Sequence, residues 1–100
     1  MILPEYLSQK NKKIIDRYGL PEQLLQLQEE CAELIQAASK YRRKRNLSDK
    51  AEVALSAQNL RCEITDVLVL IDQIMERVGV TKESLELMAE YKIDRTIGRM

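Results

Sequence analysis

The chain has 100 residues, of which 45% are hydrophobic and 32% charged, so it is long enough for one globular domain, residues 1–100, and little more. Its 16 Lys and Arg balance its 16 Asp and Glu, which argues against nucleic acid or a membrane surface as the main partner. The absence of histidine excludes His-based catalytic triads and di-iron bundles of the Glu-x-x-His type. No apolar run reaches the length of a membrane span, and no signal-peptide core is present, so we expect a cytoplasmic protein.

The hydrophobic spacing predicts two helices in the first half of the chain. Residues 8–18 are predicted to form a short amphipathic helix with Ile14 and Ile15 facing inward, and Gly19 ends it. A second helix is expected over residues 21–45. Its packing seam, with alternating spacings of three and four residues, is expected to be Leu24, Leu27, Cys31, Leu34, Ala38 and Tyr41.

Two further helices are expected in the second half. The pattern breaks at residues 46–48, and a long helix then follows up to Gly79, with a break between residues 50 and 58 left open. Its expected seam is Ala57, Leu60, Ile64, Val67, Ile71, Ile74 and Val78. Thr81 offers a cap for the fourth helix, whose inward residues are expected to be Leu85, Met88 and Ala89. The fold class is therefore all-α, with four helices.

An uninterrupted apolar run lies in the predicted third helix. Residues 67–71 are apolar through more than a full turn, so several sides of this helix must be covered. Three other helices, two of them short, would have difficulty covering both the run and the seam. We therefore expect a homo-oligomer, a homodimer or homotetramer, with a monomeric bundle as the alternative.

Two pairs of carboxylates stand beside these seams. Glu30 and Glu33 lie in the second helix, and Glu63 and Asp66 lie in the third. Residues three apart project from one side of a helix, so seam-to-seam packing would let both pairs converge. Four oxygen ligands favour Mg²⁺, or Mn²⁺ as a substitute, over softer metals, and Mg²⁺ commonly binds substrate phosphates. The alternative is a solvated acidic face paired with nearby Lys or Arg.

The two cysteines adjoin these pairs in the chain. Cys31 and Cys62 have neither the spacing nor the number of a zinc site or a disulfide framework. We expect both to be reduced residues of the core.

The order of the acids carries a resemblance to a known family. The segment Glu29-Glu30-Cys31-Ala32-Glu33, followed by Glu63-Ile64-Thr65-Asp66, resembles the EExxE…ExxD signature of the MazG-like all-α nucleoside triphosphate pyrophosphohydrolases. The resemblance covers most of the chain after Gly19, and it implies a four-helix MazG-like bundle. The gap between the two motifs is long for the family, which suggests an extended connection over residues 46–57.

The resemblance also implies an activity. The family uses Mg²⁺ to hydrolyse nucleoside or deoxynucleoside triphosphates to the monophosphate and pyrophosphate. The catalytic residues implied by the match are Glu29, Glu30, Glu33, Glu63 and Asp66. The last four are the expected Mg²⁺ ligands, and Glu29, about 100° round the helix, is expected to orient a water or a basic side chain.

Basic residues suggest where substrate phosphates would bind. Lys40 lies two turns beyond Glu33 and returns to the carboxylate side of its helix. Lys92 and Arg95, three residues apart, are favoured as phosphate ligands by the resemblance. The cluster at residues 42–45 is the basis of an alternative function, a non-catalytic helical module that binds nucleic acid or an acidic partner.

Overall fold

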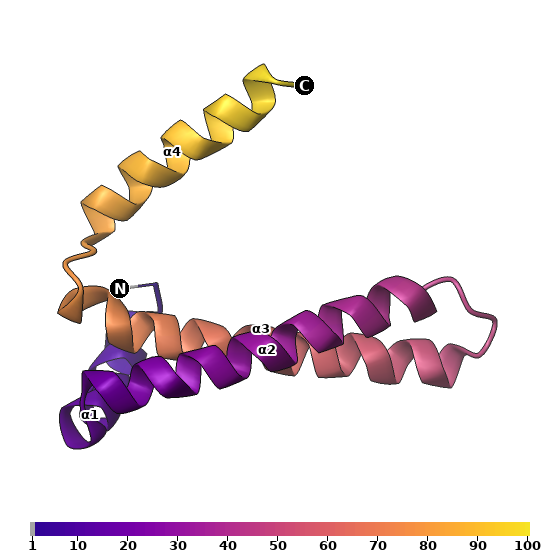
Figure 1. Cartoon of the computed structure of the whole chain (residues 1–100), viewed down its shortest axis with the longest axis horizontal. Coiled ribbons are helices and arrows are strands. Elements are labelled where there is room, and N and C mark those ends of the chain that lie inside the picture. Colours follow the sequence, from indigo (N-terminus) through magenta and orange to yellow (C-terminus); the bar gives the residue numbers. More distant parts are fainter. Residues whose placement is uncertain (1) are drawn as a thin grey trace.

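The computed structural model describes residues 2–100, which form four α-helices and no strand. Figure 1 shows their order along the chain. The helices are α1 (Glu5–Tyr18), α2 (Leu20–Lys44), α3 (Lys50–Arg77) and α4 (Lys82–Gly98). This confirms the all-α prediction and the number of helices. No helix within residues 2–100 is long and apolar enough to cross a membrane.

The helix ends follow local sequence signals. Gly19 separates α1 from α2 with φ of 87°, a conformation that favours glycine. The Asp49 carboxylate caps α3 by accepting from the backbone N–H groups of Ala51 and Glu52. Helix α1 begins three residues earlier than predicted, and α3 runs unbroken through residues 50–58.

Helices α2 and α3 form a long antiparallel hairpin (Figure 1). The less exposed positions of each helix repeat at spacings of three and four, as in a coiled coil. On α2 they are Gln23, Leu27, Glu30, Leu34, Ala37, Tyr41 and Lys44. On α3 they are Val53, Ser56, Leu60, Glu63, Val67, Leu70 and Ile74. The hairpin interface thus includes one glutamate from each helix.

The predicted seams were half wrong. About half of the predicted seam residues, including Leu34 and Val67, do lie in the interface. For the others, the residue in the interface is the one directly before the predicted residue. Ile64, predicted to face inward, is 42% exposed, whereas its neighbour Glu63 is partly buried. At four of the displaced positions the cause is that an apolar residue directly follows the inner polar one, which is Gln23, Glu30, Ser56 or Glu63. Hydrophobicity alone therefore selected the wrong member of each pair.

Helix α1 is joined to the hairpin by buried polar side chains. The Gln23 Nε2 amide donates to Gln73 Oε1 at 2.8 Å, and Gln73 Nε2 donates to Asn11 Oδ1 at 2.7 Å. Asn11 Nδ2 in turn donates to the backbone carbonyl of Val69 at 2.8 Å. This chain of bonds links α1, α2 and α3. Beside it Ile15 is buried as predicted, but Ile14 is 41% exposed.

Helix α4 projects away from the other three helices (Figure 1). Within residues 2–100, no Cα of α4 comes within 8 Å of a Cα in α1, α2 or α3. The predicted inward residues are therefore uncovered within one chain: Met88 is 56% exposed, and Leu85 and Ala89 are only partly shielded. A helix of this length has little stability without packing.

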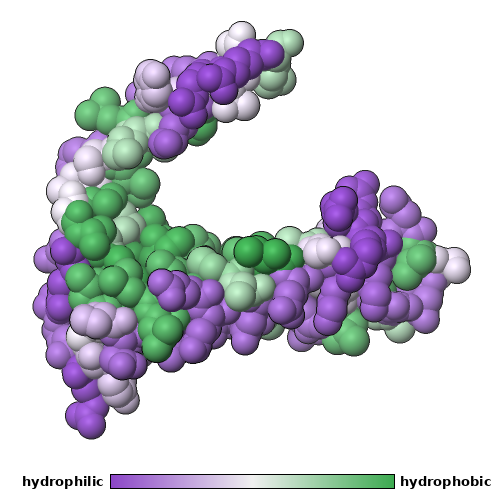
Figure 2. All heavy atoms as spheres, in the orientation of Figure 1, coloured by the Kyte–Doolittle hydropathy of each residue, from purple (hydrophilic) through white to green (hydrophobic). Residues whose placement is uncertain are grey.

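Apolar surface remains exposed on both parts of the molecule. Figure 2 shows it on the inner side of the angle between α4 and the hairpin, extending along the hairpin. The exposed apolar side chains of the hairpin include Leu24, Ile35, Leu55, Ile64 and Leu68, and those of α4 include Leu87, Tyr91, Ile93 and Ile97. An apolar surface of this extent is typical of an interaction site.

Candidate metal centre

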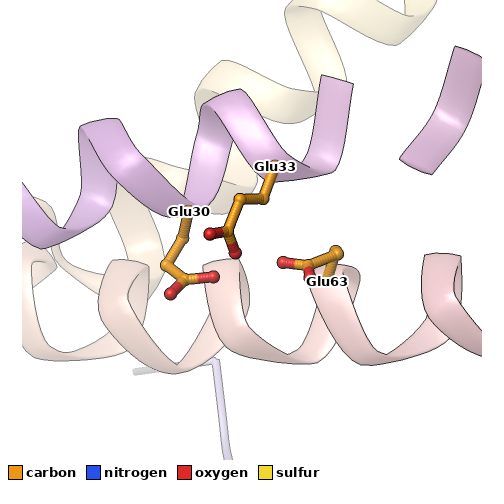
Figure 3. A group of neighbouring side chains, drawn as sticks. All are labelled: Glu30, Glu33 and Glu63. Atoms are coloured by element: carbon orange, nitrogen blue, oxygen red, sulfur yellow. The ribbon is translucent and has the colours of Figure 1, made fainter. Parts of the chain in front are cut away.

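Three glutamates meet between α2 and α3. Glu30 and Glu33 extend from α2 and Glu63 from α3, and their carboxylates point toward one another (Figure 3). Each residue offers one carboxylate oxygen, and these three oxygens all lie within 4.8 Å of one another. Glu30 and Glu63 occupy interface positions and are partly buried, while Glu33 is exposed beside them. We refer to these three residues as the acidic cluster.

The cluster is electrostatically unfavourable without a positive charge. Burial, followed by the charge of Glu33 and hydrogen bonding to Glu33 and Glu63, raises the pKa of Glu30 to about 7. Within residues 2–100, no Lys or Arg forms an ion pair with any member of the cluster. The Oε2 atoms of Glu30 and Glu63 are buried and have no hydrogen-bond partner. Such unpaired oxygens cost free energy that a bound cation or proton would recover.

The donor set fits a hard divalent cation. All three groups are carboxylates, which suit Mg²⁺ or Mn²⁺, and the cluster contains no nitrogen or sulfur ligand. The buried Oε2 atoms of Glu30 and Glu63 have no hydrogen-bond partner and could therefore serve as metal ligands. Bound Mg²⁺ usually keeps several water ligands and needs few protein ligands. The exposed side of the cluster leaves room for such waters.

Asp66 lies near the cluster but outside it. Its charge is one of the causes of the raised pKa of Glu30. Because the helices are antiparallel, a step of three residues from Glu63 to Asp66 runs opposite to the step from Glu30 to Glu33. In Figure 3 Glu63 lies beyond Glu33, on the side away from Glu30, so the step from Glu63 to Asp66 returns along the hairpin toward Glu30. The predicted convergence of four carboxylates holds for three of them, with Asp66 about one turn away.

Glu29 is exposed and does not belong to the cluster. It lies next to Glu30 in the chain, yet a rotation of about 100° carries it to a different side of α2. The structure thus separates it from the other predicted catalytic residues. Neither neighbouring cysteine forms a disulfide; Cys31 is partly exposed, and Cys62 is exposed rather than in the core as predicted.

The predicted phosphate-binding residues lie in two places. Lys40 is exposed on α2, about 10 Å along the helix from Glu33. Lys92 and Arg95 are exposed on α4, which does not pack against the hairpin, so one chain does not bring them to the cluster. In the basic segment after Lys40, Lys44 pairs with Glu52 at 2.8 Å and Arg43 donates to Ser39 Oγ.

A second carboxylate site, at Asp72, was not predicted from the sequence. Asp72 is 8% exposed, and it accepts hydrogen bonds from the backbone N–H groups of Ile2 and Leu3 and from the side chains of Ser8 and Asn11. Burial raises its pKa, but these bonds outweigh burial and hold the pKa below its usual value. A hollow of about 340 Å³ lies beside it, between α1 and the end of α3. Because Asp72 is fully engaged in holding the N-terminal segment, we assign it a structural role.

Comparison with models of known protein families, with curated proteins and with solved structures finds no match.

Proposed function

We propose that the protein hydrolyses a nucleoside or deoxynucleoside triphosphate to the monophosphate and pyrophosphate in a Mg²⁺-dependent reaction. The observation that carries this proposal is the acidic cluster, in which three carboxylate oxygens converge without a cationic partner and two oxygens are buried and unpaired. The EExxE…ExxD resemblance of the same residues indicates which reaction the cluster serves. Mn²⁺ is the expected substitute metal.

The residues of the hairpin have distinct roles in this proposal. Glu30, Glu33 and Glu63 would hold the metal, and Asp66 would bind a further metal-site water or complete the shell after a side-chain movement. Bound Mg²⁺ neutralises phosphate charge and lowers the pKa of a coordinated water. Lys40, on the Glu33 side of α2, contacts the outer phosphates. Glu29 stays outside the metal shell and orients a water or a basic side chain.

Assay of pyrophosphate release tests the proposal. The protein is incubated with a panel of ribo- and deoxyribonucleoside triphosphates and Mg²⁺, next to a Glu33→Gln variant. A matched control is Glu22→Gln, an exposed acid in the first turn of α2 and outside the cluster. We expect release by the wild type and the control, and a loss of about 100-fold or more in the cluster variant, because changing a residue that only supports a metal ligand already costs about 10–100-fold and Glu33 is itself a proposed ligand.

A different result would favour the alternative function. If the wild type and Glu33→Gln released no pyrophosphate from any nucleotide, the enzyme proposal would be rejected. Binding of nucleic acid or an acidic partner through residues 42–45 would then be tested by its dependence on salt. The exposed side chains of Arg42 and Arg45 are free to make such contacts.

The proposal includes an oligomer and a location. The exposed apolar surface of α4 and the hairpin supports a homodimer or homotetramer, because a monomer would leave this surface in water. We place the protein in the cytoplasm, where nucleoside triphosphates and free Mg²⁺ are present.

A further inference from the structure

The outward side of α1 carries basic residues and no acid. Asn11 and Ile15 are buried and hold the inner side of this helix against the hairpin. At 100° per residue, the side opposite Ile15 holds one aromatic and three basic residues, all exposed. They are Tyr6, Lys10, Lys13 and Arg17. The two acids of α1, Glu5 and Asp16, lie about a quarter of a turn away from this side.

These three bases have no ionic partner within residues 2–100. Asp16, the nearest acid, is bound by Lys12 at 3.1 Å and by Arg77 instead. Like charges three and four residues apart destabilise a helix, so the arrangement costs stability that an anionic partner would restore. The helix dipole favours Arg17, which lies in the last turn, but the other two bases stand in the middle of α1, where the dipole has little effect.

Two exposed tyrosines accompany the bases. Tyr6 is 68% exposed and lies one turn before Lys10, whereas Tyr18 is 58% exposed and ends the helix. The Arg17 guanidinium lies over the Tyr18 ring, 5.7 Å from its centroid. The two tyrosines are twelve residues apart, which is about 18 Å along α1. Proteins that bind single-stranded nucleic acid combine bases that meet the phosphates with aromatic rings on which nucleobases stack.

The chemistry of α1 favours a single strand over other anionic partners. A helix that binds a membrane inserts a broad apolar side into the lipid. The apolar side of α1 is instead packed on the hairpin, where Ile15 is 1% exposed, and Ile14 is the one exposed aliphatic residue of the helix. An acidic peptide would pair with the bases but leave the tyrosines unused. A single strand has phosphates for the bases and nucleobases for the rings.

We propose that the outward side of α1 binds single-stranded nucleic acid, with its three bases on backbone phosphates and its tyrosines stacked on nucleobases. In Figure 1, α1 lies at the end of the hairpin opposite the loop of residues 45–49. This surface is therefore distinct from the basic segment at residues 42–45. It also contains no member of the acidic cluster, so the binding needs no Mg²⁺ and does not depend on the proposed hydrolysis.

Fluorescence anisotropy of a labelled single-stranded DNA of about 16 nucleotides, without divalent cations, measures the binding. The logarithm of the binding constant should fall with the logarithm of salt concentration with a slope of about −2, since each of three phosphate contacts contributes about −0.7. Lys10→Gln/Lys13→Gln should reduce the slope to about −0.7 and weaken binding on the order of 50-fold at about 50 mM salt. The matched control is Arg42→Gln/Arg45→Gln, which makes the same charge change at the other end of the hairpin and should have little effect. Equal losses in the two double variants would overturn the proposal.

A tyrosine pair tests the stacking. Tyr6→Ala should weaken binding about 5-fold or more, because it removes a ring on which a nucleobase stacks. Its control is Tyr91→Ala on α4, where the side chain is 67% exposed, and this change should leave binding as in the wild type. Circular dichroism checks that all variants keep their helical content. No binding of the single strand, or binding of the DNA duplex, of polyglutamate or of anionic phospholipid vesicles as tightly as the single strand, would overturn the proposal.

Discussion

Replacement of Glu30 by glutamine should stabilise the metal-free protein. Glu30 lies at the hairpin interface beside Glu33 and Glu63, and its pKa is raised from 4.5 to about 7. A shift of this size corresponds to at most about 3.4 kcal/mol between the charged and neutral forms. Because Glu30 is only partly buried, screening by water reduces the expected gain to about 1–2 kcal/mol. The neutral Gln amide also donates hydrogen bonds to the neighbouring carboxylates.

The gain should depend on pH in a definite direction. A folded-state pKa above the unfolded value means that the native state binds the proton more tightly, so this contribution is complete below pH 4.5 and is lost as pH rises through 7. Wild type and Glu30→Gln should therefore have similar stability at about pH 4, below both pKa values. The variant should become more stable at pH 8.

Urea or thermal unfolding at fixed protein concentration measures this difference. With Mg²⁺ at about 100 times its dissociation constant, the wild type should gain about 2.7 kcal/mol, and the variant should gain much less. Glu29→Gln is the matched control, because Glu29 is exposed and outside the cluster. A destabilised Glu30→Gln protein at pH 8, or an equal response of both variants to Mg²⁺, would refute the assignment of Glu30 to a cation site.

Three further changes test the fold. Asp72→Ala should lower the free energy of unfolding by about 2–4 kcal/mol, because it removes the acceptor of several buried hydrogen-bond donors. Urea unfolding measures this loss, and a value below about 0.5 kcal/mol would contradict the prediction. Since the pKa of Asp72 is lowered, its contribution is present above the usual Asp range and is lost on acidification below it. Ile64→Lys places a charge on the exposed apolar side of the hairpin, so light scattering at micromolar concentration should give the mass of one chain. An unchanged oligomer would mean that the side of the hairpin with Ile64 is not an interface between copies. Asp49→Ala should cost about 1 kcal/mol in thermal unfolding through loss of the α3 cap, and a neutral effect would show that α3 does not need it.

The sequence predicts the helices well because their signals are local. Gly19 and Thr81 each act on the few residues beside them, and the structure uses both at helix boundaries, while the cap of α3 is Asp49. The packing of α4 could not be predicted in the same way. Its apolar residues are spread around the helix, so periodicity does not select one side, and no other helix within residues 2–100 approaches it.

The carboxylates were predicted as neighbours of the seam, and the structure places two of them within it. Glu30 and Glu63 take interface positions that apolar residues fill in most helical hairpins, while the apolar Cys31 and Ile64 beside them point elsewhere. Hydrophobic patterning assumes that the interface is the most apolar side of a helix. The assumption fails for α2 and α3, because each helix has apolar residues on a second side, next to the side that packs in the hairpin.

Three sides of the hairpin are thus distinguishable by their residues. In heptad terms, the a and d positions join α2 to α3, the e positions are apolar, and the g positions are polar. The e positions are Leu24, Cys31 and Ala38 on α2, with Ala57, Ile64 and Ile71 on α3. The g positions are Gln26, Glu33 and Lys40 on α2, with Asn59, Asp66 and Gln73 on α3.

Antiparallel helices bring like positions to the same edge of a hairpin, so one edge is apolar and the other is polar. Glu33, Asp66 and Lys40 all lie on the polar edge, beside the two interface glutamates. This explains why the charge of Asp66 acts on Glu30 although the two residues are on different helices. The apolar edge can then hold the apolar side chains of a second copy while the carboxylates stay within reach of long basic side chains and a cation. A change on one edge should consequently alter assembly, and a change on the other should alter cation binding.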